Sequence, residues 1–270
     1  MTQDTRDTLY AGLDAPADGF VFDARVARVF ADMLRRSVPG ATELVRLTGL
    51  VAAHVATTQL KSQPQSQPPI RSRMESPIQS PIRPLRVYDL GCSLGASSAS
   101  ILAHLPPGAP VHIIAVDNAP AMIDGLRERL GDAVADGRVQ PRCCDVLELP
   151  IAGAHVVVLN LTLQFLPRAQ RLALLRRIRR GLEPGGVLIL AEKVVWPDQA
   201  TDAVMAALHA RFKRTQGYSA LEVSRKRAAL ERVLVPDDRE THEDRLRAAG
   251  FQRVVPFFQC LNFVGWLAWA

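Results

Sequence analysis

One pair of segments restricts the possible folds of this chain more than any other. Residues 87–90 (VYDL) run into a turn that holds Gly91 and Gly95, and a second apolar run, 113–116, ends in Asp117. An apolar run that ends in glycines predicts a buried parallel strand and a tight turn, where missing side chains leave room for a ligand. A carboxylate at the end of the next strand is placed to accept hydrogen bonds from a ribose diol. We interpret these segments as a nucleoside-binding site.

The spacing of the glycines distinguishes between kinds of nucleotide site. The turn reads G-x-x-x-G and therefore lacks the G-x-G-x-x-G fingerprint of dinucleotide sites. Gly95 is followed by Ala-Ser-Ser, whereas a triphosphate loop requires Lys and then Ser or Thr. The D-x-G-x-x-x-G pattern that begins at Asp89 suits S-adenosyl-methionine, which carries no phosphate. A glycine turn in some other α/β sheet stays open as the alternative.

Composition and charge limit where the protein can reside and what it can bind. The 270 residues are 48% apolar and 22% charged, which suffices for one large α/β domain. No apolar stretch approaches the roughly 18 residues of a membrane span, and the polar N-terminus lacks a secretory core, so we expect a cytoplasmic protein without membrane contact. The four cysteines (92, 143, 144 and 260) have no metal-ligand spacing, which predicts reduced thiols and no metal. The net charge of +6 is typical of a solvated basic surface and permits, without requiring, RNA contact.

Hydrophobic periodicity divides the chain into three parts. Residues 1–60 carry two helical patterns and predict an N-terminal helical extension packed on the core. Residues 61–84 are rich in Pro, Gln and Ser, which predicts a flexible insert. Residues 85–270 alternate strands and helices, which predicts a doubly wound Rossmann-like sheet, mostly parallel with an antiparallel last strand. The expected helices are 22–36, 42–58, 96–104, 120–130, 168–181 and 240–249, and the expected strands are 85–90, 111–116, 138–143, 155–160, 186–192 and, as a final hairpin, 253–269.

Two segments of the third part have special roles. Residues 182–186 (LEPGG) predict a helix stop and a tight turn into the next strand. Residues 198–232 interrupt the alternation with a helical insertion rich in Arg and Lys. We expect this insertion to cover the ligand crevice or to pair with another subunit.

Several motifs go beyond a generic fold. They are RSVPG (36–40), YDLGCSLG (88–95), AVDNAPAMI (115–123), LNLTLQFL (159–166), FKRTQGYS (212–219) with SRKR (224–227) after it, and FFQCLNF (257–263). Together they closely resemble the carboxy-S-adenosyl-methionine synthase family of the class I methyltransferase-like proteins. The resemblance covers nearly the whole chain apart from the insert.

The resemblance implies a homodimeric enzyme that converts S-adenosyl-methionine and prephenate to carboxy-S-adenosyl-methionine and phenylpyruvate. A separate enzyme then uses the product to form 5-oxyacetyl-uridine at the tRNA wobble position, so direct tRNA binding is not required. The chemistry is physically sound, because a positive sulfur acidifies the attached methyl group and lets its carbon act as a nucleophile toward carbon dioxide. Prephenate releases carbon dioxide and hydroxide as its ring aromatises. The protein then mainly supplies proximity, a water-poor cage and cations.

The resemblance also assigns the cofactor turn and the ribose site. Gly91, Cys92 and Ser93 match the turn whose backbone lies against the methionine part of the ligand. Asp117 and Asn118 match the acid and its neighbour that contact the ribose and the adenine. Without the resemblance, Cys92 is a packing thiol and Asp117 a helix cap.

The remaining matched residues lie farther along the chain. Asp145 and Val146 match the pair that contacts the adenine, and Asn160 matches the residue that faces the reacting end of the ligand. Arg227 matches the arginine that holds the new carboxylate, for which a guanidinium is a planar, bidentate partner. Considered alone, residues 225–227 resemble a solvated helix face. Asn160 and Arg227 are the catalytic candidates.

One position departs from the family pattern. The family has a tyrosine directly after SVPG that contacts the cofactor, whereas this chain has Ala41. The lost ring is expected to weaken cofactor binding unless another side chain replaces it. Weaker candidates for substrate, subunit or acid–base contacts are Tyr218, Lys213, Arg214, His209 and His242.

Two other functions remain open at this stage. One is a conventional S-adenosyl-methionine-dependent methyltransferase acting on tRNA or a small molecule. The other is a ligand sensor or RNA-binding module without catalytic activity, which would use the same turn and the basic surface.

Overall fold

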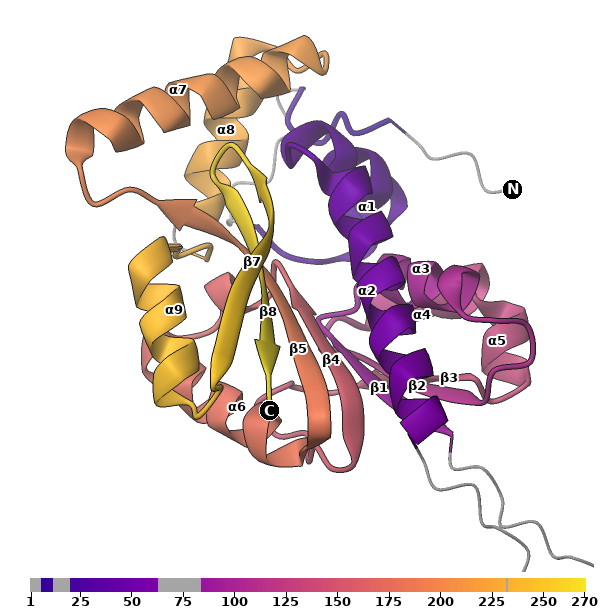
Figure 1. Ribbon diagram of the computed structural model, residues 1–270. Coiled ribbons are helices and arrows are strands. Elements are labelled where there is room, and N and C mark those ends of the chain that lie inside the picture. Colours follow the sequence, from indigo (N-terminus) through magenta and orange to yellow (C-terminus); the bar gives the residue numbers. More distant parts are fainter. Residues whose placement is uncertain (1–5, 12–19, 63–83, 232) are drawn as a thin grey trace, which may run out of the picture.

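The fold is a single twisted sheet covered by helices on both faces (Figure 1). A computed structural model describes residues 6–11, 20–62, 84–231 and 233–270. The insert predicted at 61–84 falls, except for its edges, outside the described residues. The strands are β1 (Leu85–Leu90), β2 (Val111–Asp117), β3 (Val139–Cys143), β4 (Ala154–Asn160), β5 (Leu182–Val195), β6 (Asp237–Asp238), β7 (Arg253–Cys260) and β8 (Phe263–Trp269).

The strand order confirms the predicted class. Along the sheet the order is β3-β2-β1-β4-β5-β8-β7, and β6 pairs with β5 outside this path. Strands β1 to β5 pair with one another in parallel, whereas β8 runs antiparallel to β5 and to β7. The final hairpin therefore closes one side of an otherwise parallel, doubly wound sheet.

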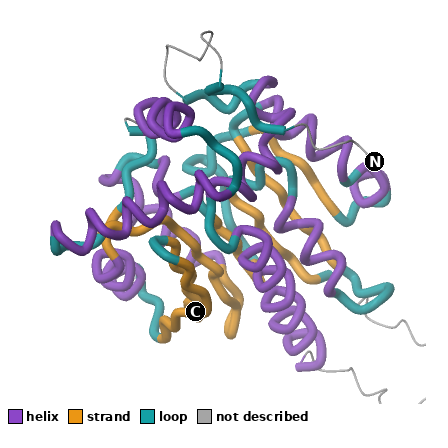
Figure 2. Tube along the Cα trace, turned by 90° about the horizontal axis from the view of Figure 1, so that it is seen from above, coloured by secondary structure: helices purple, strands orange, loops and turns teal. Residues whose placement is uncertain are grey.

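Alternating residues of the buried strands face two separate cores, and helices lie on both sides of the strands (Figure 2). Tyr88 and Leu90 belong to one core with α6 and α9, whereas Val87 belongs to the other with α2, α3, α4 and α5. This alternation follows from the two-residue period of a strand. The helices are α1 (Ala24–Ser37), α2 (Ala41–Ser62), α3 (Ala96–His104), α4 (Pro120–Arg129), α5 (Gly131–Ala135), α6 (Arg168–Gly181), α7 (Gln199–Thr215), α8 (Ala220–Leu230) and α9 (Arg239–Ala248), with a 3₁₀ turn η1 (Leu163–Phe165).

One detail differs from the sequence prediction. The turn predicted at 182–186 is part of β5, which begins at Leu182 and pairs there with Ala154 across a register shift; Gly185 has a φ of +74°. Ala52 and Ala56 of α2 are fully buried against the sheet. The division of the chain at residues 60 and 85 remains a prediction.

Helices α7 and α8 form the predicted insertion. In Figure 1 they lie beyond the end of β5, on the side of the molecule where the parallel strands have their carboxyl ends. Helix α1 approaches them from the other flank of the sheet. The three helices therefore surround the edge at which doubly wound sheets bind their ligands.

Candidate active site

A cavity of about 1310 Å³ opens at the carboxyl ends of the parallel strands. Small-molecule pockets typically measure about 300–1,000 Å³, so this cavity has room for a nucleoside and a second compound. The sequence-predicted residues all line it: Gly91, Cys92, Ser93, Asp117, Asn118, Asp145, Val146, Asn160 and Arg227. The structure thus brings together residues from four strand ends and from α8.

The glycine turn after β1 is fixed by contacts within the protein. The buried Asp89 accepts hydrogen bonds from the Ser98 amide at 3.1 Å and from its hydroxyl at 2.7 Å, and burial raises the pKa of Asp89 to about 6. Gly91 has a φ of +73°, and a Cβ there would lie 2.1 Å from Oγ1 of Thr162. At Gly95 a Cβ would meet Leu126 and Leu130 at 3.0 Å. Protein atoms rather than a ligand therefore take the room that these glycines leave, which corrects the prediction made from the motif.

One residue within the turn has a strained backbone. Ser93 has a φ of +48°, and its amide donates to Oδ2 of Asp117 at 2.9 Å. Oδ1 of Asp117 accepts from the Ala119 amide at 3.0 Å, so each carboxylate oxygen retains a lone pair for a ligand hydroxyl. Burial raises the pKa of Asp117. Strained residues cluster at binding sites, where surrounding contacts hold them in place.

The loop after β3 presents a carboxylate and a backbone amide to the cavity. Oδ1 of Asp145 accepts from the Leu147 amide at 2.8 Å, which folds the loop back on itself. The Arg177 guanidinium donates to the carbonyl oxygens of Val146 and Leu147. Arg177 thereby fixes the loop from the side of α6 and leaves the Asp145 carboxylate at the cavity wall.

Asn160 at the end of β4 holds a polar atom without a partner. Its Nδ2 donates to Oγ1 of Thr48 at 3.1 Å and to Oγ of Ser97 at 3.3 Å. Its Oδ1 is buried and, among the described residues, accepts no hydrogen bond. Buried polar atoms are almost always paired, so this oxygen indicates a ligand donor at the same place. The next residue, Leu161, has a φ of +55°.

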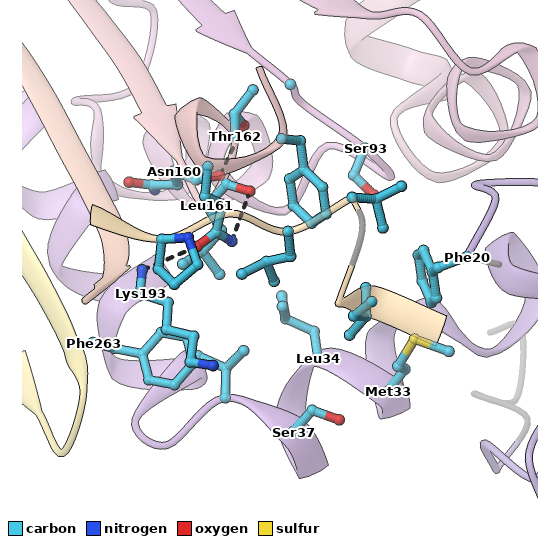
Figure 3. Close-up of a pocket in the computed structure, with 18 of the residues that line it drawn as sticks. Phe20, Met33, Leu34, Ser37, Ser93, Asn160, Leu161, Thr162, Lys193 and Phe263 are labelled. Atoms are coloured by element: carbon cyan, nitrogen blue, oxygen red, sulfur yellow. Dashed lines mark hydrogen bonds between the residues drawn. The ribbon is translucent and has the colours of Figure 1, made fainter. Parts of the chain in front are cut away.

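Cations gather at the other end of the cavity. Figure 3 shows Ser93 and Phe20 on one side and Lys193 and Phe263 on the other. Lys193 from β5, Lys213 from α7 and Arg227 from α8 line the cavity there. The charges of Lys226, Lys193 and Arg227 help to lower the pKa of Lys213. Burial is the main cause and brings that pKa to about 7.

The helix face at 225–227 is not uniformly solvated. Lys226 is 3% exposed, and its ammonium donates to Oδ2 of Asp7 at 3.2 Å and to Oγ of Ser37 at 2.9 Å. Arg227 is exposed at the cavity rim. Treating this segment as a plain solvated face is therefore wrong at Lys226, because the N-terminal segment packs against it.

The weaker candidates divide into two groups. His209 lines the cavity, but its Nε2 is 2.7 Å from the Ser37 carbonyl oxygen, and burial lowers its pKa to about 3. Its ring packs edge-on against Phe263. Ala41 is buried at the cavity wall and belongs to the same apolar cluster as Phe263. Outside the lining residues lie Arg214, His242 and Tyr218, the last of which donates its hydroxyl hydrogen to Asp7.

Sequence reasoning missed two charged residues at the end of β5. Glu192 is fully buried and accepts hydrogen bonds from the amides of Thr162, Leu163 and Gln164, which fixes the loop after β4. Lys193 follows it at the cavity. A signal was present, because a Glu-Lys pair directly after the apolar run 187–191 marks the carboxyl end of a buried strand.

Two findings concern metals and membranes. In the parts of the chain that the structure describes, His, Cys, Asp and Glu side chains form no cluster of three or more that suits a metal ion. Within the same residues, every helix is too short or too polar to cross a bilayer.

The fold and the site define the class of protein to which the chain belongs. A family profile described as a methyltransferase domain matches residues 87–186. The structure is similar to human N-acetylserotonin methyltransferase in complex with SAM (TM-score 0.56, 14% identity, 91% of this chain and 55% of that one). It is equally similar to the S-adenosylmethionine-dependent methyltransferase SibL (TM-score 0.56, 18% identity, 98% of this chain and 62% of that one). The chain thus has the fold of the S-adenosyl-methionine-dependent methyltransferases.

Sequence relatives define the family within that class. The carboxy-S-adenosyl-L-methionine synthase of Shewanella oneidensis is 41% identical over 98% of both chains. The protein of the same name from Actinobacillus pleuropneumoniae is 40% identical over 97% of this chain and 98% of its own. This chain belongs to the carboxy-S-adenosyl-L-methionine synthase family. The resemblance predicted from the motifs is confirmed, and a ligand sensor without catalytic activity is excluded.

Proposed function

We propose that this enzyme converts S-adenosyl-methionine and prephenate to carboxy-S-adenosyl-methionine, phenylpyruvate and water. One carbon–carbon bond forms, between the methyl carbon and the carbon dioxide that prephenate releases. The hydroxide lost from the aromatising ring takes the methyl proton and leaves as water, so atoms and charges balance. The observation that carries the proposal is Arg227, a cation of α8 that shares one cavity with the Gly91 turn and Asp117.

The cavity residues have distinct roles in this reaction. Asp117 accepts hydrogen bonds from the ribose hydroxyls, and Asp145 and the Val146 amide contact the adenine. The unpartnered Oδ1 of Asn160 accepts from a donor at the reacting end of the ligand. Arg227 binds the carboxylate on the methyl carbon, because a guanidinium pairs with a carboxylate in two parallel hydrogen bonds. A general base on the protein is not required, since the second substrate supplies hydroxide.

The direct test is incubation with S-adenosyl-methionine and prephenate. We expect phenylpyruvate to form together with a nucleoside whose mass corresponds to the carboxylated product. Methylation of tRNA or of a small molecule with no carboxylated nucleoside would instead support a conventional methyltransferase. Equal signals from protein-free controls would refute catalysis of the prephenate reaction.

Arg227→Ala tests the assignment of the arginine. We expect the variant to bind S-adenosyl-methionine as the wild type does and to lose most of its preference for the carboxylated form. Arg211→Ala is the matched control, because Arg211 is an exposed cation of α7 outside the cavity lining. An unchanged ratio of the two dissociation constants in Arg227→Ala would contradict the assignment.

We further propose a homodimer in the cytoplasm whose product serves the formation of 5-oxyacetyl-uridine at the tRNA wobble position. Val204 and Leu208 support the dimer, because they lie one helical turn apart on α7 and are 59% and 43% exposed. Sedimentation of wild type and of a Val204→Glu variant tests this surface. A wild-type monomer at micromolar concentration would refute the dimer.

A further inference from the structure

The cations at one end of the cavity differ in whether the protein neutralises them. Lys226 pairs with Asp7, and the buried Arg171 pairs with Asp237. Among the described residues, neither Lys193 nor Lys213 forms an ion pair, and Asp202 attracts Lys193 only from farther away. These two ammonium groups therefore lie half-buried at the cavity wall, and no described carboxylate forms an ion pair with either.

Uncompensated charge at a partly buried wall is costly. Burial lowers the pKa of Lys193 and of Lys213, and nearby Arg227 lowers both further. A carboxylate between the two ammonium groups would offset the loss of solvation and the mutual repulsion. This part of the cavity is thus built for a polar, anionic group.

An apolar surface lies directly beside the lysines. Val38, Ala41 and Phe263 form a buried cluster with Leu34 packed against it, and all four line the cavity. Figure 3 shows Lys193 next to Phe263, with Leu34 on the opposite side of the space. A ligand that fits here has a carboxylate for the lysines and an apolar ring for the cluster.

We propose that Lys193 and Lys213 bind the carboxylate that the second substrate keeps through the reaction, with its ring against Phe263 and Leu34. The ligand class is a carboxylic acid with a six-membered ring. The inference rests on the proposed function, in which prephenate carries two carboxylates. One leaves as carbon dioxide near Arg227, and the other remains in the side chain of phenylpyruvate. The lysine subsite would hold this retained group.

Binding without turnover tests the subsite directly. The protein is saturated with S-adenosylhomocysteine, which has no methyl group to react, and phenylpyruvate is titrated by calorimetry. We expect Lys193→Met and Lys213→Met each to weaken phenylpyruvate binding about tenfold or more, since a hydrogen bond to a charged group is lost. Lys213→Arg should retain affinity within about threefold, because it keeps the charge.

Matched controls separate the subsite from general damage. Arg214→Met removes a neighbouring exposed cation outside the cavity lining and should leave binding unchanged. Phenylacetone, which lacks the carboxylate, should bind wild type and Lys213→Met equally. Unchanged phenylpyruvate affinity in both lysine variants, or an equal loss for S-adenosylhomocysteine, would overturn the proposal.

The experiment keeps the two proposals distinguishable. Lysine-dependent binding of phenylpyruvate without turnover of prephenate would refute the reaction and support the subsite. Normal turnover with lysine-independent binding would refute the subsite and support the reaction.

Discussion

The turn after β1 allows a quantitative prediction about Gly91→Ala. The new Cβ would lie 2.1 Å from Oγ1 and 2.5 Å from Cγ2 of Thr162, at a φ of +73°. Gly108 is a matched control, because its φ is +74° and a Cβ there would meet no atom within 4 Å. The two substitutions therefore share the backbone cost and differ in the steric clash.

The magnitudes follow from these two terms. A left-handed conformation costs an L residue about 1–2 kcal/mol, which is the whole expected effect of Gly108→Ala. Overpacking adds about 1–3 kcal/mol at Gly91, because Thr162 is held in place. Its hydroxyl donates to the carbonyl oxygens of Leu90 at 3.2 Å and Asn160 at 3.0 Å. We expect Gly91→Ala to destabilise the fold by about 2–5 kcal/mol.

Urea and thermal unfolding measure the difference between the two variants. The extra 1–3 kcal/mol corresponds to a midpoint lower by roughly 2–12 °C for a chain of this size. Thr162→Ala removes Oγ1 and Cγ2, so it should destabilise the Gly91→Ala background less than the wild type. Equal losses for Gly91→Ala and Gly108→Ala, or strictly additive effects with Thr162→Ala, would refute the packing argument.

Three more predictions concern affinity, stability and pH. Ala41→Tyr should tighten S-adenosyl-methionine binding about three- to tenfold by adding a ring at the cavity wall, as calorimetry would show; unchanged affinity would contradict this. Asp237→Asn should destabilise the fold by about 3–5 kcal/mol in urea unfolding, because it leaves the fully buried Arg171 guanidinium without its carboxylate partner. Asp124→Asn changes an exposed carboxylate and, as the control, should cost under about 0.5 kcal/mol. Phenylpyruvate affinity should not change with pH below about 7, where the Lys213 ammonium is already charged. The affinity should fall above pH 7, because binding must then take up a proton. An affinity that does not depend on pH and that matches the affinity of Lys213→Arg would contradict this.

The sequence allowed prediction of the sheet and of one half of the site. Apolar runs that alternate with helical patterns predict parallel strands, and parallel strands place their carboxyl ends at one edge. Asp117 closes such a run, so the pattern itself predicted it at a ligand site, whereas Asp145 and Asn160 were assigned through the family resemblance; all three line one cavity. Arg227 was identified only through the family motif, since helical spacing by itself is typical of a solvated face.

The roles of the turn glycines required the tertiary structure. The motif predicted a tight turn at Gly91 and Gly95, which is a local property of the chain, and both glycines have a positive φ. It did not specify what fills the space beside them. Thr162 and Leu126 come from other elements, so only the packed fold shows that protein side chains occupy this space.

The amino-acid sequence by itself determined the fold class and the family, because these depend on periodicity and on short contiguous motifs. Only the tertiary structure decided which of the described cations an ion pair neutralises. Lys193, Lys213 and Lys226 are alike in sequence, yet Asp7, more than two hundred residues away along the chain, neutralises Lys226 alone. Charge compensation depends on distance in space, and distance in space is set by the packing of α7 and α8 against the N-terminal segment and the sheet.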